Sequence, residues 1–342
     1  MKKKILSAAR LLFFLGLGAL FIWLFLRKLS PEQKGEIWES FWTANYWWAL
    51  LSILLGLMSH FIRALRWRIL LSPMGYKPRL SNAFHCVMIG YFANLALPRL
   101  GEVTRCTALA KYEKIPFQKS FSTVIVERVI DLILFAGLFF LTLILQWNHI
   151  RNYVYDQIYH PLAERFAFLQ DTGVVWMSIL GFAFVLALIL YLIRKRFERF
   201  GIYRKMRQLI LDLLEGLMAV SRIRKPVTFI FQSLMIWLLY YLMLYACLFC
   251  FKETAGLGPN AALAMLVFGS IGIMVVQGGI GIYPAIIAEV GSLYAVEATT
   301  AYALGWLAWT AQTLMVILAG IAALLFLPMI NKKNVPTGEN PA

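Results

Sequence analysis

Negatively charged residues are scarce in this chain, which has 17 Asp and Glu against 33 Lys and Arg and a formal net charge of +16. A basic excess of this size is common in proteins that bind nucleic acids. Here, however, most of the basic residues lie in short segments between apolar runs, which is the pattern of the positive-inside rule. We therefore expect a membrane protein with no nucleic-acid partner.

Cysteine and histidine are also rare, with four of each. Cys247 and Cys250 have the C-x-x-C spacing, but no second pair is present to complete a metal site. The sequence contains no G-x-x-x-x-G-K-[ST] motif, no paired-His metal motif and no nucleophile–base signature. We expect no disulfide framework, no metal, no cofactor and no catalytic residue, and hence a protein that is not an enzyme.

Apolar residues, in contrast, make up 61% of the chain, and its mean hydropathy is +0.72. Soluble domains are about 45–50% apolar, so the composition predicts an all-α polytopic membrane protein. The first apolar run follows a basic start, as in a signal peptide, but it ends in Arg27-Lys28 without a small-residue cleavage site, which indicates a retained span. Six full spans are predicted: residues 6–26, 46–66, 117–147, 174–193, 227–251 and 302–327.

Two further apolar runs are too short to cross the bilayer alone. Residues 83–97 would rise about 22 Å as a helix, less than the roughly 30 Å hydrocarbon core, and Pro98 then ends the run. Residues 261–276 are followed by a glycine-rich break at 277–281. A full crossing by the first run would place basic segments on both sides of the membrane. We predict two re-entrant helical hairpins, at 83–116 and 261–298, and keep eight full crossings as the alternative.

With these hairpins, the single membrane domain 1–342 becomes an inverted-topology repeat. Residues 1–150 and 174–330 each contain a span, a second span, a hairpin and a third span, in opposite orientations. An interfacial helix follows the first span of each half, at 31–44 and 201–222. The start of the first of these helices is indicated by Ser30 as N-cap, Pro31 at the first helical position and Gln33 at the capping-box position. Both termini are then cytoplasmic, and a transport site is expected near the midplane between the broken helices.

Charged residues gather at the first break and at the head of the next span. Six of them have formal charges that sum to zero: Arg99, Glu102, Arg105, Glu127, Arg128 and Asp131. At roughly 3 kcal/mol each at the bilayer centre, six unpaired charges would cost on the order of 18 kcal/mol, so pairing or a position near the cytoplasmic head groups is required. One interpretation is a structural network that joins the hairpin to the long helix. The other is a site where arginines hold an anionic head group by bidentate hydrogen bonds.

Several motifs carry a resemblance to a known family. Pro98-x-x-Gly101-Glu102-x-x-Arg105 is followed by Glu127-Arg128-x-x-Asp131, with Arg66-Trp67 and Gly90-Tyr-Phe-Ala-Asn94 upstream and a glycine-rich break late in the chain. Over nearly the whole chain, this pattern resembles the flippase-like family named after the transmembrane region of lysylphosphatidylglycerol synthase. The family's late break continues into a glutamate, where this chain has Tyr283-Pro284.

The resemblance implies movement of a lipid across the bilayer, and two further sets of residues join the candidate site. Arg66 and Asn94 extend the head-group site, and the second hairpin contributes Gln277, Gly278, Gly279, Gly281 and Tyr283. Its glycines form either a flexible break or a turn whose backbone N–H groups would face a ligand. Larger members of the family carry a soluble aminoacyl-transferase domain that makes the lipid. This sequence shows no such segment before Ala342, so we expect transport without synthesis.

We therefore expect a lipid translocase of the bacterial inner membrane. Its partner would be an anionic phospholipid or a polyprenyl-phosphate-type lipid, with the head group bound by Arg99, Arg105 and Arg128. Two alternatives stay open. One is a membrane-embedded lipid-phosphate transferase or hydrolase, with Glu102, Glu127 and Asp131 in acid–base roles, and the other is a transporter of a small anionic solute.

Overall fold

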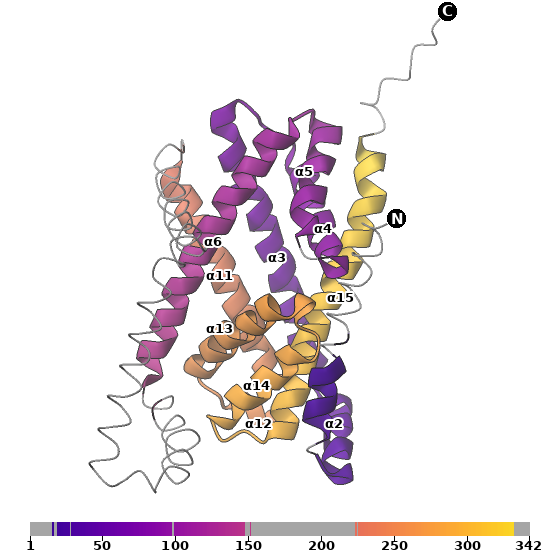
Figure 1. Ribbon diagram of the computed structural model, residues 1–342, viewed down its shortest axis with the longest axis vertical. Helices are drawn as coiled ribbons and strands as arrows, with labels where there is room; N and C mark the ends of the chain where they lie inside the picture. Colours follow the sequence, from indigo (N-terminus) through magenta and orange to yellow (C-terminus); the bar gives the residue numbers. More distant parts are fainter. Residues whose placement is uncertain are drawn as a thin grey trace, which may run out of the picture. The chain divides into compact units, whose positions relative to one another are not determined.

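A computed structural model describes residues 19–27, 29–97, 99–147 and 225–331 and the single positions 16, 151 and 223. All regular structure in these ranges is helical, and they contain no strand (Figure 1). The chain divides into two compact units, residues 1–145 with 221–342 and residues 146–220. The second unit lies almost entirely outside the described residues, as do the predicted span 174–193 and interfacial helix 201–222. The architecture below is that of the first unit.

Four helices in the described ranges are long and apolar enough to cross a membrane: α3 (Tyr46–Leu71), α6 (Phe117–Leu145), α11 (Pro226–Leu248) and α15 (Ala298–Ile330). Even α11, the shortest at 23 residues, is about 34 Å long at 1.5 Å per residue. The protein is therefore a helical, multi-pass membrane protein, as the composition predicted. Of the predicted first span, position 16 and residues 19–26 are described, and they are helical.

The second span is longer than its predicted range of 46–66. Helix α3 continues to Leu71 and is followed by the 3₁₀ turn η1 (Ser72–Met74). Arg63 and Arg66 fall within the predicted range, and in the structure both are buried, at 4% and 0% exposure. They belong to the interior of the protein rather than to a basic segment outside the apolar helix.

Two shorter helix pairs complete the unit. They are α4 (Leu80–Ala96) with α5 (Leu100–Glu113), and α13 (Pro259–Val275) with α14 (Ile282–Ser292), with the four-residue helix α12 (Lys252–Ala255) before the second pair. In Figure 1 the α4–α5 pair lies in the upper half of the unit and the α13–α14 pair in the lower half. The helix breaks thus fall where the sequence predicted them, at residues 97–99 and 276–281. The re-entrant path of these pairs and the inverted repeat stay predictions, because no membrane is present.

Each break depends on left-handed backbone. Arg99 has a φ of 64° and precedes α5, while Gly278, Gly279 and Gly281 have φ values of 70°, 71° and 72° around the 3₁₀ turn η4 (Gln277–Gly279). Glycine adopts this conformation without the Cβ clash that other residues meet. The second break is therefore a glycine turn, whereas the first holds an arginine in an uncommon conformation.

Each helix pair also packs into its own hydrophobic core. Trp67 and Leu71 of α3 pack with Met88 of α4 and Leu109 of α5. Around the second pair, one core joins α11, α13, α14 and α15 through Leu248, Met265, Ile287, Tyr302 and Leu304. Both pairs are thereby fixed against the long helices that flank them.

Helix α2 (Pro31–Thr43) has the start predicted for the earlier interfacial helix. Ser30 caps it, with its hydroxyl accepting from the Gln33 backbone N–H while the Gln33 side chain accepts from the Ser30 N–H. Trp38 and Trp42 on its surface are 66% and 75% exposed. Exposed tryptophans are typical of a helix at the membrane–water boundary.

Candidate functional site

Two arginines of α3 face two carboxylates of α6. Arg63 and Arg66 are one turn apart, and both donate to Asp131, from Nη1 of Arg63 to Oδ2 at 2.8 Å and from Nη1 of Arg66 to Oδ1 at 2.7 Å. Arg63 also donates to the Tyr240 hydroxyl at 2.9 Å, and Arg66 donates to the Ser233 hydroxyl at 3.1 Å. Both oxygens of Asp131 are therefore occupied, and the pairing joins α3, α6 and α11.

A second buried ion pair lies between α5 and α6. Arg105 donates to Glu127 at 2.5 Å, and the Nε of Arg66 lies 3.6 Å from the same carboxylate. The side chains of Arg105 and Glu127 are only 5% and 1% exposed, and the Arg105 guanidinium lies 4.7 Å from the centre of the Trp67 ring. Removing one partner of a buried ion pair typically costs about 3–5 kcal/mol, because the other charge is left uncompensated. This part of the cluster holds the first helix pair to the long helices.

A third set of charges is more open. Arg128 donates to Glu102 at 2.8 Å, with side-chain exposures of 46% and 17%. Arg99 makes no ion pair with any residue that the structure describes, and it is exposed. The cluster contains five arginines and three carboxylates, an excess of two positive charges, and one of these two lies in the open part, where Arg99 and Arg128 accompany Glu102.

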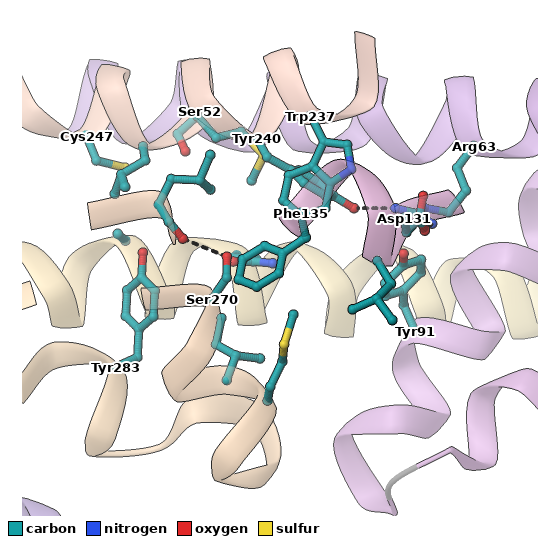
Figure 2. A pocket seen from close by; sticks show the side chains of 18 of the residues that line it. Ser52, Arg63, Tyr91, Asp131, Phe135, Trp237, Tyr240, Cys247, Ser270 and Tyr283 are labelled. Carbon is teal, nitrogen blue, oxygen red and sulfur yellow. Dashed lines mark hydrogen bonds and ion pairs between the residues drawn. The ribbon is translucent and has the colours of Figure 1, made fainter. Parts of the chain in front are cut away.

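The two arginines of this open part, Arg99 and Arg128, line a cavity of about 620 Å³ (Figure 2). Its wall includes residues of both helix pairs and of all four long helices. In Figure 2, Arg63, Asp131 and Tyr91 lie at one end, Ser52, Cys247 and Tyr283 lie at the other, and Phe135 and Trp237 lie between them. The charged lining residues are Arg63, Arg99, Arg128 and Asp131, all from α3, the first break and α6. The part of the wall formed by α11, α13, α14 and α15 carries no charge.

The predicted site residues therefore fall into two groups. Arg99, Arg128, Asp131 and Tyr283 line the cavity. The others from the first half do not line it: Arg66, Glu102, Arg105 and Glu127 form the ion pairs behind it, and the Asn94 side chain accepts from the Gly101 N–H at 2.7 Å. The structure thus places a paired network and an accessible pair of arginines next to each other, and head-group binding by the second set stays a prediction.

At the second helix break, the predicted residues are described mainly by their backbone. The Gly278 carbonyl accepts a hydrogen bond from the Trp309 indole, and Gly279 and Gly281 continue the turn into α14. The side chain of Gln277 lies outside the described residues. Of the predicted residues at this break whose side chains are described, Tyr283 is the one that lines the cavity.

The cavity residues that were not predicted as site residues include Arg63, Tyr91, Trp237 and Tyr240. Arg63 is three residues before Arg66, so helical spacing places both on one face. Tyr91 and Tyr240 are polar positions in apolar runs, which is a weak signal. Trp237 carries a buried Nε1–H without a hydrogen-bond partner among the described residues, a feature that appears only in the structure.

Comparison with known proteins identifies two partial relatives. A stretch of 111 residues is 32% identical to a UPF0104 membrane protein of Methanocaldococcus jannaschii and covers 32% of each chain. A stretch of 78 residues is 32% identical to the glycosyltransferase AglD of Haloferax volcanii and covers 22% of this chain and 12% of that protein. The chain thus spans about a third of the first relative's length and about an eighth of the second's.

No solved structure matches the chain. The model of one protein family does match it, from residue 8 to residue 329, and that family is described as the lysylphosphatidylglycerol synthase TM region. The match covers nearly all of the 342 residues, including both helix pairs and the whole charged cluster. The chain therefore belongs to the family of the lysylphosphatidylglycerol synthase transmembrane region.

Proposed function

We propose that this protein is a lipid translocase that moves an anionic or phosphate-bearing lipid across the membrane. The observation that carries the proposal is the cavity of about 620 Å³, which is charged at one end and neutral at the other and is lined by both broken helix pairs. Arg99 and Arg128 would hold the phosphate. Membership of a family named after a lipid synthase's membrane region supports a lipid as the substrate.

The accessible arginines suit a phosphate better than the buried ones do. A guanidinium offers planar, bidentate hydrogen bonds to phosphate oxygens. Arg99 forms no ion pair with a described residue, so no such contact has to break when a phosphate binds. Arg128 would break its ion pair with Glu102, and 46% of its side chain is already exposed to a ligand. Arg105, in contrast, is held by Glu127 and lies outside the cavity wall, which favours a supporting role for it.

The remaining wall suits the rest of a lipid. Leu132, Phe135, Leu266, Ile273 and Met274 provide apolar surface in the same cavity. In our proposal the two helix pairs are re-entrant hairpins of an inverted repeat, which would bring the helix breaks to the midplane, where transporters of this architecture bind their substrates. The membrane would be the bacterial inner membrane, with both termini in the cytoplasm.

The proposal is tested with the purified full chain in liposomes that contain a trace of fluorescent phosphatidylglycerol. Quenching from outside with a membrane-impermeant reductant measures the fraction of labelled lipid that reaches the outer leaflet. We expect complete quenching with the protein and about half without it. Arg99→Gln should slow the exchange at least tenfold, whereas Lys119→Gln, an exposed cation of α6 outside the cavity, should not change it. Exchange no faster than in empty liposomes would refute the proposal.

A membrane-embedded transferase or hydrolase is less well supported. Its acid–base candidates Glu102, Glu127 and Asp131 each already accept from an arginine. A general acid or base needs a proton-transfer path to the substrate, and Glu127 is only 1% exposed. Mass spectrometry of lipids from expressing cells provides the test, because a modified lipid found only there would favour the enzyme.

A further inference from the structure

A second cavity lies between the α4–α5 pair and the C-terminal half of α15, and we call it the α5–α15 groove. Its volume is about 390 Å³, within the range of roughly 300–1,000 Å³ that is typical of ligand sites. Its wall is formed by one face of α5, by Ile89 of α4 and by Leu324, Leu327 and Pro328 of α15. These residues are different from those that line the cavity of Figure 2. The α4–α5 pair and the C-terminal end of α15 both lie in the upper half of the unit (Figure 1).

Most of the groove wall is suited to a hydrocarbon chain. Val103 of α5 and Leu324 of α15 are large apolar residues, yet they are 44% and 46% exposed. The hydroxyl groups of Thr104 and Thr107 donate to backbone carbonyls one turn earlier in α5, at 2.8 and 2.9 Å. These hydroxyl groups therefore need no partner from a ligand, and an apolar chain can lie against them without the loss of a hydrogen bond.

One end of the groove is basic. Lys111, in the last turn of α5, lines the groove together with Tyr112, and its Nζ lies 5.3 Å from the centre of the Tyr112 ring. Lys111 is exposed and forms no ion pair with a described residue. Glu113 accepts from the Arg79 backbone N–H at 3.0 Å, which joins the end of α5 to the start of α4. This junction carries three further exposed cations, Lys77, Arg79 and Lys114.

This order of surfaces matches the two parts of a phospholipid. Val103 and Lys111 are eight residues apart, which is about 12 Å along α5 at 1.5 Å per residue. A lysine and a tyrosine at the end of an apolar surface are typical of the head-group level of a membrane. Cations at that level attract anionic lipids. The groove is therefore complementary to a lipid with an apolar chain and a negatively charged head group.

We propose that the α5–α15 groove binds an anionic phospholipid that the protein holds rather than moves. The lipid phosphate pairs with the Lys111 ammonium, and one acyl chain lies between Val103 and Leu324. Because the groove joins the first helix pair to the last span, the bound lipid stabilises this contact. The inference is independent of the proposed translocation, whose cavity is formed by other residues.

Photochemical cross-linking identifies what occupies the groove. The photoreactive residue p-benzoylphenylalanine replaces Thr107 in the groove wall or, as a control, Ile144, which is a 73% exposed residue of α6. The full chain is placed in nanodiscs of phosphatidylcholine with a minority of phosphatidylglycerol, and mass spectrometry after illumination identifies the attached lipids. We expect the share of phosphatidylglycerol at position 107 to be about fivefold that at position 144, the ratio that corresponds to one lysine near an anionic lipid.

Two lysine variants test whether Lys111 causes this enrichment. With the photoreactive residue at position 107, Lys111→Gln should lower the share of phosphatidylglycerol to the value found at position 144. Lys252→Gln is the matched control, since Lys252 is an exposed cation of α12 that does not line the groove, and it should leave the share unchanged. Enrichment that persists in Lys111→Gln would overturn the assignment of the phosphate to this lysine.

Other occupants of the groove would give different products. A covalent dimer would show that a second copy of the chain covers the groove, and a link to another segment of the same chain would show that this segment fills it. Either product in place of the lipid would overturn the inference. Equal shares of phosphatidylglycerol at positions 107 and 144 would do so too, because they indicate ordinary contact with the bilayer.

Thermal unfolding in detergent gives a second measurement without the photoreactive residue. A ligand that binds only the folded protein raises its unfolding temperature by mass action. We expect dioctanoyl phosphatidylglycerol to raise this temperature by about 2 °C more than dioctanoyl phosphatidylcholine does. Lys111→Gln should lose the difference, while Lys252→Gln and the cavity variant Arg99→Gln should keep it. Loss of the difference in Arg99→Gln alone would assign the lipid to the transport cavity and overturn the inference.

Transport assays on the same samples separate this inference from the proposed function. If the chain moves no lipid but position 107 is enriched in phosphatidylglycerol, translocation is refuted while the groove site stands. If the chain moves lipid without this enrichment, the groove site is refuted while translocation stands.

Discussion

Asn94, in the last turn of α4, closes the first helix break by a side-chain contact to Gly101 in the first turn of α5. Its Oδ1 accepts a hydrogen bond from the Gly101 N–H at 2.7 Å. Helix N-termini expose N–H groups that require such acceptors. Because Arg99 lies between these two residues in left-handed backbone, the Asn94–Gly101 contact fixes the position from which Arg99 enters the cavity.

The close approach of α4 and α5 makes Gly101 sensitive to any added side chain. A Cβ at Gly101 would collide with the Gly90 carbonyl oxygen and with the Asn94 side chain. We predict that Gly101→Ala lowers the free energy of unfolding by about 1–3 kcal/mol, the usual range for overpacking. Thermal unfolding of the purified protein in detergent measures the change.

The matched control for this variant is Gly137→Ala in α6. A Cβ there would meet no atom within 4 Å. Because alanine favours a helix over glycine by about 1 kcal/mol, this variant should be as stable as the wild type or slightly more so. Equal destabilisation by both substitutions would show that the contact between α4 and α5 is not tight.

The charged cluster should separate into a structural part and an accessible part when its carboxylates are neutralised one at a time. Glu127→Gln leaves Arg105 without its buried counter-charge, while Arg66 keeps Asp131, and we expect the free energy of unfolding to fall by about 3–5 kcal/mol. Glu102→Gln breaks the ion pair with Arg128, whose side chain is 46% exposed. The free energy of unfolding should therefore fall by at most about 1 kcal/mol. Unfolding transitions of the two variants provide the comparison. Equal losses would contradict the division.

Much of this cluster was predictable from the sequence because charges in apolar surroundings must find partners. The spacing of Glu127 and Asp131 places them on one face of α6, and the pairing of Arg105 with Glu127 and of Arg128 with Glu102 agrees with a network between the first hairpin and the long helix. The helix breaks were also predictable, since a proline and a glycine cluster end the two short apolar runs.

The partners of Asp131 were not predictable in the same way. Arg63 and Arg66 resemble the basic residues that usually end a span, and their burial against α6 is seen only in the structure. Helical periodicity tells which residues share a face, but it does not tell which helix that face meets. For the same reason Tyr91 and Trp237 resembled ordinary apolar packing, although both line the cavity.

The second break depends on a hydrogen bond from the last span. The Trp309 Nε1–H donates to the Gly278 carbonyl at 2.5 Å. We predict that Trp309→Phe lowers the free energy of unfolding by about 1 kcal/mol for the hydrogen bond, with a further loss from the smaller ring. Trp47→Phe is the control, because Trp47 is 78% exposed and its replacement should have no measurable effect. A loss no larger than that of the control would show that this hydrogen bond does not hold the break.

The path of the first helix pair is open to a direct test. Helix α4 has 17 residues and α5 has 14, so they extend about 26 Å and 21 Å, and neither spans the roughly 30 Å hydrocarbon core alone. If the pair is re-entrant, Lys77 before α4 and Gln118 after α5 lie on the same side of the membrane. If the pair crosses as one broken span, they lie on opposite sides.

A single cysteine introduced at each of these positions shows on which side of the membrane the position lies, through its reaction with a membrane-impermeant maleimide. The four native cysteines are buried and are replaced by alanine first. We predict that Lys77→Cys and Gln118→Cys react only in inside-out vesicles, whereas Lys252→Cys, in the segment predicted to lie outside, reacts only in right-side-out vesicles. Lys77, Gln118 and Lys252 are all exposed, so their side of the membrane, not burial, decides the labelling. Labelling of Lys77→Cys together with Lys252→Cys, and of Gln118→Cys from the opposite side, would replace the re-entrant hairpin by a full crossing.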